Sequence, residues 1–182
     1  QQPYIYNASA INNRDYFNHN YKAGADYTIN KKNNIGIMLM GTHSEANGTS
    51  TNRNTISNFF TGVADSVLNS DQTWNFSNDN ININFNHQFK DTLGHELSTD
   101  LDVGYYDSNR DNYLPNVYTL LGSNEQLSST YYRSLTPAQI IIYSAKSDYT
   151  QNFLKGKIGL GFKTAIVNTD NTFNFYDVVD GN

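Results

Sequence analysis

Alternation of apolar and polar positions is the clearest pattern along the chain, and it is strongest between residues 80 and 105. From Ile81 to Phe89 every second residue is apolar apart from His87, and the positions between them are asparagine or glutamine. Residues 96–105 alternate in the same way, with acidic or small residues on the polar face. A period of two residues indicates β-strands, and the turn residues at 90–94 predict that the two strands form an antiparallel hairpin.

Two further hairpins are predicted on the same grounds. Residues 21–29 and 35–40 alternate on either side of a polar turn at 31–34, and residues 140–153 and 157–169 flank a turn at 154–156. Strands that follow one another through short turns pair antiparallel. The sequence therefore predicts an all-β chain, an antiparallel meander of long hairpins.

The segments between these hairpins are long and polar, at residues 42–77 and 107–136. We expect both to be loops, although the first can hold a hairpin of its own with arms at 55–57 and 66–68. Residues 134–139, with Pro137 in the first turn, predict a short helical turn. Short turns at one end and long loops at the other are typical of outer-membrane barrels. A soluble β-sandwich also alternates and also has uneven loops, so this pattern leaves both architectures open.

The composition adds limits to the function. The chain contains 28 asparagines and 14 tyrosines, which favours many strand faces in contact with water over one thick core. No apolar stretch approaches the roughly 20 residues of a transmembrane helix, whereas a barrel strand needs only about 9–11 alternating residues. The absence of cysteine excludes disulfides and thiolate chemistry, and a net charge of −5 argues against nucleic-acid binding.

Candidate chemistry is sparse. Asp100 and Asp102 share one strand face, where carboxylates can hold a cation or act as an acid–base pair. In a barrel they would face the water-filled interior, so we expect them, with Asn82 and Asn84, to line the wall as the candidate ligand contacts. His87 and His95 flank a turn but have too few neighbouring ligands to predict a metal site. No nucleophile or cofactor motif occurs, so the sequence predicts neither an enzyme nor a cofactor.

The aromatic side chains allow three interpretations: an interfacial girdle, a sandwich core, or a surface on which carbohydrate stacks. The residues concerned are Tyr27, Trp74, Tyr105, Tyr106, Tyr143 and Tyr149.

Several segments, in this order, resemble the barrel region of TonB-dependent outer-membrane receptors, in the subfamily called outer membrane protein β-barrel. Residues 24–34 resemble its G-x-D-Y-x-hydrophobic-x-K-K-N strand and turn, and residues 144–149 resemble its S-x-K-x-D-Y strand. The hairpin at 80–106 and the strand and loop at 160–175 resemble the segments that go with them. The likeness spans about Tyr21 to Tyr176.

This resemblance implies that residues 1–182 are a single segment of an outer-membrane barrel, without the plug domain and the remaining strands. It implies energised nutrient uptake across the cell outer membrane. The partners would be membrane lipid, the TonB complex acting through the missing plug, and a nutrient that the sequence does not identify. Open strand edges would make the isolated segment self-associate. The alternative from the residues alone is a secreted β-sandwich that binds carbohydrate or mediates adhesion.

Overall fold

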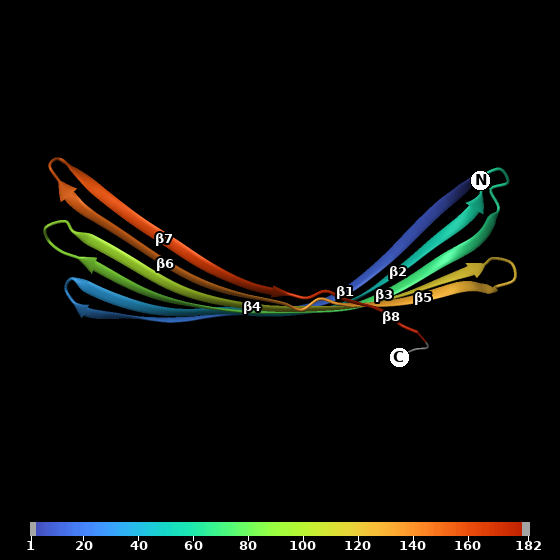
Figure 1. Cartoon of the computed structure of the whole chain (residues 1–182), viewed down its shortest axis with the longest axis horizontal. Coiled ribbons are helices and arrows are strands. Elements are labelled where there is room, and N and C mark those ends of the chain that lie inside the picture. Colours follow the sequence, from blue (N-terminus) through green and yellow to red (C-terminus); the bar gives the residue numbers. More distant parts are fainter. Residues whose placement is uncertain (1–2, 180–182) are drawn as a thin grey trace.

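The computed structural model describes residues 3–179, and these form one antiparallel sheet whose two ends bend to the same side (Figure 1). No helix that could cross a membrane occurs in this part of the chain. The strands are β1 (Tyr4–Asn30), β2 (Asn33–Asn58), β3 (Ala64–Lys90), β4 (Glu96–Leu120), β5 (Gln126–Leu135), β6 (Ala138–Phe153), β7 (Gly156–Asn171) and β8 (Asn174–Asp177).

These eight segments act as six long strands. β5 and β6 follow each other along β4, and between them Arg110 and Thr136 exchange backbone hydrogen bonds of 3.3 and 2.8 Å, so pairing continues across the break. β7 and β8 follow each other in the same way along β6 and β5. Every long strand therefore pairs with its neighbour in the chain, which is the arrangement of a pure meander.

The three predicted hairpins are confirmed, as are the all-β class and the antiparallel meander. β1 meets β2 at residues 31–32, β3 meets β4 at 91–95, and β6 meets β7 at 154–155. These turns lie together at one end of the sheet, on the left of Figure 1. The opposite end carries the turns at 59–63 and 121–125.

The expected loops are wrong. Residues 42–77 are the second half of β2 and the first half of β3, joined by a five-residue turn at 59–63. Of the expected features, only the hairpin suggested within this segment is present. Residues 107–136 complete β4 and form β5. The helical turn expected at 134–139 is also wrong, because Leu135 ends one strand and Ala138 begins the next. Both polar segments are thus strand for most of their length, in β2 and β3 for the first and in β4 and β5 for the second.

The sheet has no compact core. Its accessible surface is 12753 Å², against about 8,900 Å² for a globular protein of this mass. Within residues 3–179 the only buried apolar side chains are those of Ala46 and Val67. A β-sandwich needs a second layer that covers one face, and these residues form a single layer, so the sandwich alternative does not describe this chain.

Candidate functional site

Most apolar side chains near the short turns share one face of the sheet and are exposed on it. In the two central strands the exposed fractions are 41% for Phe85 and 47% for Leu101, whereas the neighbouring asparagines on the other face of β3 are half-buried. The registers bring these residues into rows that run across the strands, such as Ile37, Phe85 and Leu101. We call this set the apolar band, and it consists of the outward-facing positions of 21–29, 35–41, 81–89, 97–105, 141–149 and 158–166.

The height of the apolar band matches a bilayer. It covers nine residues in most strands, close to the roughly 9–11 that a tilted barrel strand uses to cross the hydrocarbon layer. Tyrosines lie at both borders: Tyr27 and Tyr149 toward the short turns, and Tyr21 and Tyr105 at the other side. Amphipathic rings at both interfaces are typical of outer-membrane barrels.

The girdle interpretation therefore holds for part of the aromatic set. Tyr27, Tyr105 and Tyr149 lie at the borders of the apolar band, and Tyr143 lies within it. Trp74 and Tyr106 occupy the opposite face, because they fall on the same alternation as Asn82 and Asn84. These two rings belong to the polar face of the sheet, which we call the inner face.

The inner face at the height of the band is a hydrogen-bonded polar wall. Asn84 Nδ2 donates to Asp102 Oδ1 at 2.7 Å, and Ser144 Oγ donates to Asp102 Oδ2 at 3.0 Å. Tyr106 OH donates to Asn82 Oδ1 at 3.3 Å. Asp100 lies directly opposite Lys146, which pairs with Asp148 along its own strand. All four wall residues named from the sequence thus share this face, and their contact with a ligand stays a prediction.

On the outer face, a row of polar residues borders the apolar band on the side away from the turns at 31–32, 91–95 and 154–155. We call this side of the band the side above it. His43 Nδ1 lies 2.6 Å from Asp79 Oδ1, and His43 Nε2 lies 3.4 Å from Glu45 Oε1. The hydrogen bond to Asp79 is the main cause that raises the pKa of the His43 imidazole above its ordinary value. Such a row marks where the outer face passes from apolar surroundings to water.

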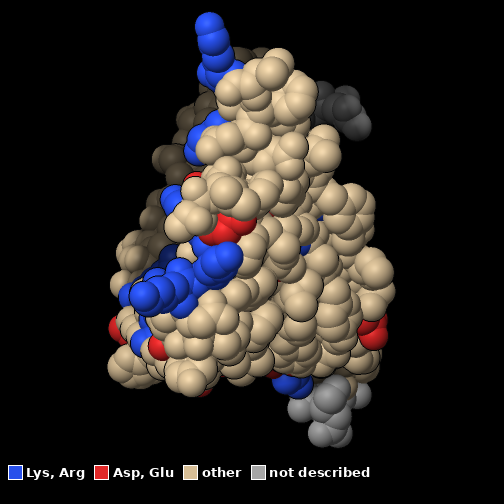
Figure 2. All heavy atoms as spheres, turned by 90° about the vertical axis from the view of Figure 1, so that its left-hand side faces the viewer, with Lys and Arg blue, Asp and Glu red and all other residues tan. Residues whose placement is uncertain are grey.

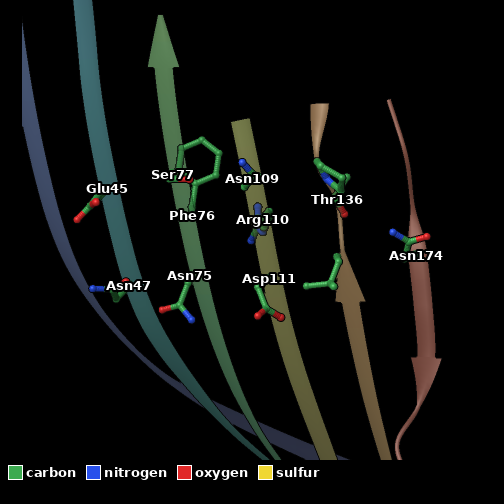
Figure 3. A pocket seen from close by; sticks show the side chains of 12 residues that line it. Glu45, Asn47, Asn75, Phe76, Ser77, Asn109, Arg110, Asp111, Thr136 and Asn174 are labelled. Atoms are coloured by element: carbon green, nitrogen blue, oxygen red, sulfur yellow. The ribbon is translucent and has the colours of Figure 1, made fainter. Parts of the chain in front are cut away.

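The outer face above this row carries a hollow where β4 exchanges its partner β6 for β5. The hollow has a volume of about 410 Å³, and Asn47, Asn75 and Asp111 lie side by side on three strands along it (Figure 3). Arg133 binds Asp111 through two hydrogen bonds of 3.0 and 2.7 Å, and this guanidinium lowers the pKa of the Asp111 carboxyl. The hollow is open, and its two carboxylates are already paired, Glu45 with His43 and Asp111 with Arg133.

The inner face above the band holds a cluster that the sequence did not reveal. The guanidinium carbon of Arg14 lies 5.0 Å from the ring centre of Tyr16 and 5.8 Å from that of Trp74. Arg110 approaches the same Trp74 ring to 5.5 Å. The alternation of 81–89, counted back along β3, is the one signal that places Trp74 on the inner face, but the polar composition before residue 77 predicts a loop there.

Lysines gather at the end of the sheet that carries the short turns. Lys90 Nζ lies 2.9 Å from Glu96 Oε1 and Lys157 Nζ lies 3.9 Å from it, and the hydrogen bond from Lys90 lowers the pKa of the Glu96 carboxyl. Figure 2 looks onto this end and shows Lys and Arg side chains gathered along one border, beside a wide surface with few charges.

The turn histidines form separate pairs. His87 Nε2 lies 3.0 Å from Asn33 Oδ1, whereas His95 Nδ1 lies 2.8 Å from Asp91 Oδ2. Hydrogen bonds from His95 lower the pKa of Asp91 to about 2. Across residues 3–179, no three side chains of the metal-binding types come together in a way that could hold an ion.

Comparison with protein families gives a match. The model of a family described as "Outer membrane protein beta-barrel family" matches residues 87–182, which is just over half of the chain. A search of the curated proteins finds no match. The matched region runs from the end of β3 through β8, so it includes three of the six strands whose outward face forms the apolar band, β4, β6 and β7.

Proposed function

Because the chain belongs to the outer membrane protein beta-barrel family, we propose that its sheet is part of the wall of a TonB-dependent receptor that takes up a nutrient. The family places the chain in the outer membrane. The finer role as a receptor, its energy source and its ligand are our proposal, and the order of segments that resembles such receptors supports it.

The observation that carries the proposal is the height of the wall. β3 has 27 residues, of which about nine cross the apolar band, so the strand continues for some 17 residues beyond it. At about 3.3 Å per residue this part reaches roughly 55 Å past the band. Its neighbours β2 and β4 extend with it, and most side chains on the inner face of these extensions are polar. A tall, hydrophilic inner surface suits the capture of a solute before passage.

Closure of the sheet is the second element of the proposal. Within the described residues β1 pairs only with β2, and β7 pairs only with β6, so each leaves a row of backbone groups along one edge. In a bilayer such groups require partners, which further barrel strands would supply. We propose that residues 1–182 are one segment of the barrel domain, and that the chain alone self-associates through these edges.

The partners follow from this role. Membrane lipid would contact the apolar band, and the TonB complex would act through a plug domain. We propose no catalytic role, because the Asp102 carboxylate of the inner wall is already hydrogen-bonded by Asn84 and Ser144.

The test compares cells that carry the gene with cells that lack it. Accumulation of radiolabelled oligosaccharides, ferric chelates and cobalamin would be measured with the inner-membrane TonB complex present and deleted. We expect at least one solute to accumulate only when both the gene and the complex are present, and surface binding to survive loss of the complex. Gene-dependent accumulation that continues without the complex would indicate a passive channel and overturn the receptor role.

A further inference from the structure

Charged residues are sorted between the two faces of the sheet above the apolar band. We define the upper inner wall as the inward-facing positions of 12–20, 42–50, 72–80 and 106–114. These positions include Arg14 and Arg110 and no aspartate or glutamate. The outward-facing positions of the same four segments carry all of their acids, which are Asp15, Glu45, Asp79, Asp107 and Asp111. This chain, whose net charge is −5, thus presents a basic surface at the upper inner wall.

Trp74 brings the two arginines together. Its ring lies over Gly48 on the neighbouring strand, at the place where any Cβ atom would collide with it. Both guanidinium groups approach this ring, so their central carbons are at most about 11 Å apart, although Arg14 and Arg110 come from β1 and β4. Lacking a side chain, Gly48 lets an aromatic ring from β3 reach across β2.

Both arginines keep hydrogen-bonding capacity. Arg110 Nε donates to Asn112 Oδ1 at 3.2 Å, which orients its guanidinium group. Within residues 3–179 neither Arg14 nor Arg110 lies within ion-pair distance of a carboxylate. Arg133 provides the contrast, since it is held by Asp111 on the outer face.

We propose that the upper inner wall binds an acidic sugar, a short oligosaccharide that carries carboxylate or sulfate groups. Guanidinium groups bind such anions through paired hydrogen bonds. The faces of Trp74 and Tyr16 offer stacking surface to a sugar ring. Amide and hydroxyl side chains lie on the same wall, among them Asn18 and Asn78, and can bind sugar hydroxyls. A neutral sugar would leave the arginines unused, and a simple anion would leave the rings unused.

This inference deepens the proposed function by naming a substrate class, and it rests on that function only in assigning the inner face to the interior of the barrel. Its test measures equilibrium binding, so it is independent of whether uptake is energised. A failed uptake experiment would leave a positive binding result standing, and an absent binding signal would leave the receptor role intact.

Trp74 is the only tryptophan in the chain, so its fluorescence reports on this site directly. The full chain, folded in detergent micelles, would be titrated with trigalacturonic acid, a sulfated chondroitin tetrasaccharide, maltotriose and sodium sulfate. We expect a saturable change in emission with one or both acidic sugars and at least tenfold weaker responses to maltotriose and sulfate. The two acidic probes separate carboxylate from sulfate recognition. Equal responses to maltotriose, equal responses to sulfate alone, or no response to either acidic sugar would each overturn the proposal.

Three variants locate the binding. We expect Arg14→Gln and Arg110→Gln each to weaken binding about tenfold, the size of one lost hydrogen bond to a charged group. Arg53→Gln is the matched control, because Arg53 lies on the outer face and its substitution removes the same charge. We expect this variant to change the affinity by less than twofold. Far-UV circular dichroism would verify that each variant is folded. Equal loss in Arg53→Gln would show a general charge effect and overturn the assignment.

Discussion

Leu101 provides the sharpest test of which face meets lipid. It lies in the middle row of the apolar band, between Phe85 on β3 and Ala145 on β6, with 47% of its surface exposed. If that surface faced water, Leu101→Arg would change the free energy of unfolding by about 0.5 kcal/mol or less. If it faces the bilayer midplane, an arginine there costs about 2–4 kcal/mol. We expect a loss of about 3 kcal/mol.

The assay is urea unfolding of the full chain in phosphatidylcholine vesicles, followed by far-UV circular dichroism. Thr73→Arg is the control, because Thr73 lies on the same outer face, is exposed, and stands well above the apolar band. It introduces the same side chain at a place that we assign to water. We expect the free energy of unfolding of Thr73→Arg to stay within about 0.5 kcal/mol of that of the parent chain, with an equal dependence on urea concentration.

Two results would refute this assignment. A Leu101→Arg chain as stable as the parent in vesicles would mean that this face does not contact hydrocarbon. Equal destabilisation by Thr73→Arg would mean that arginine disturbs strand pairing wherever it is placed, independently of lipid.

Three further predictions concern single contacts. The pKa of His43 in the folded chain is raised above the unfolded value of 6.5, mainly by its hydrogen bond to Asp79. This bond therefore stabilises the fold fully below pH 6.5, and the stabilisation is lost as pH rises through the folded pKa. Asp79→Asn should lower the pKa of His43 in an NMR titration. Asp91, with a folded pKa of about 2 against 3.8, stabilises the fold above pH 3.8 and loses this effect as pH falls toward 2; Asp91→Asn should remove that acid-dependent step from unfolding curves. Gly48→Ala should displace the Trp74 ring and shift its emission, with far-UV circular dichroism unchanged.

The hairpins were predictable because they lie where the two faces meet different surroundings. At 80–89 one face meets hydrocarbon and the other meets water, so the sequence alternates strictly. At 42–58 both faces meet water, and asparagine, threonine and serine occur on both. The period of two disappears although the strand continues, and the segment reads as a loop. Strand pairing with β1 and β3 sets the conformation there, and no single-chain pattern records that pairing.

The helical turn predicted around Pro137 is wrong for a related reason. Proline near a polar turn signal suggests the start of a helix. In the sheet, Thr136 exchanges both backbone bonds with Arg110 on β4, so the backbone groups of Pro137 face the opposite neighbour. There its carbonyl accepts from Thr172 N at 3.1 Å, and its missing N–H removes the other bond. The breaks between β5 and β6 and between β7 and β8 therefore lie side by side, at the one rung that a proline cannot complete.

Strand continuity ties the upper inner wall to the apolar band. Side chains alternate with a period of two, and β3 has no bulge between Phe85 and Trp74. Because Ile81 and Phe85 face the bilayer, Trp74 faces the inner side. The same count on β4 carries from Leu101 to Arg110. A single-residue shift in either strand would turn the ring or the guanidinium outward, among the acids of the outer face. Contact of the apolar band with lipid therefore determines which side chains of the upper inner wall face the interior of the barrel. Loops, whose backbones are not held in a sheet, would not preserve this alternation.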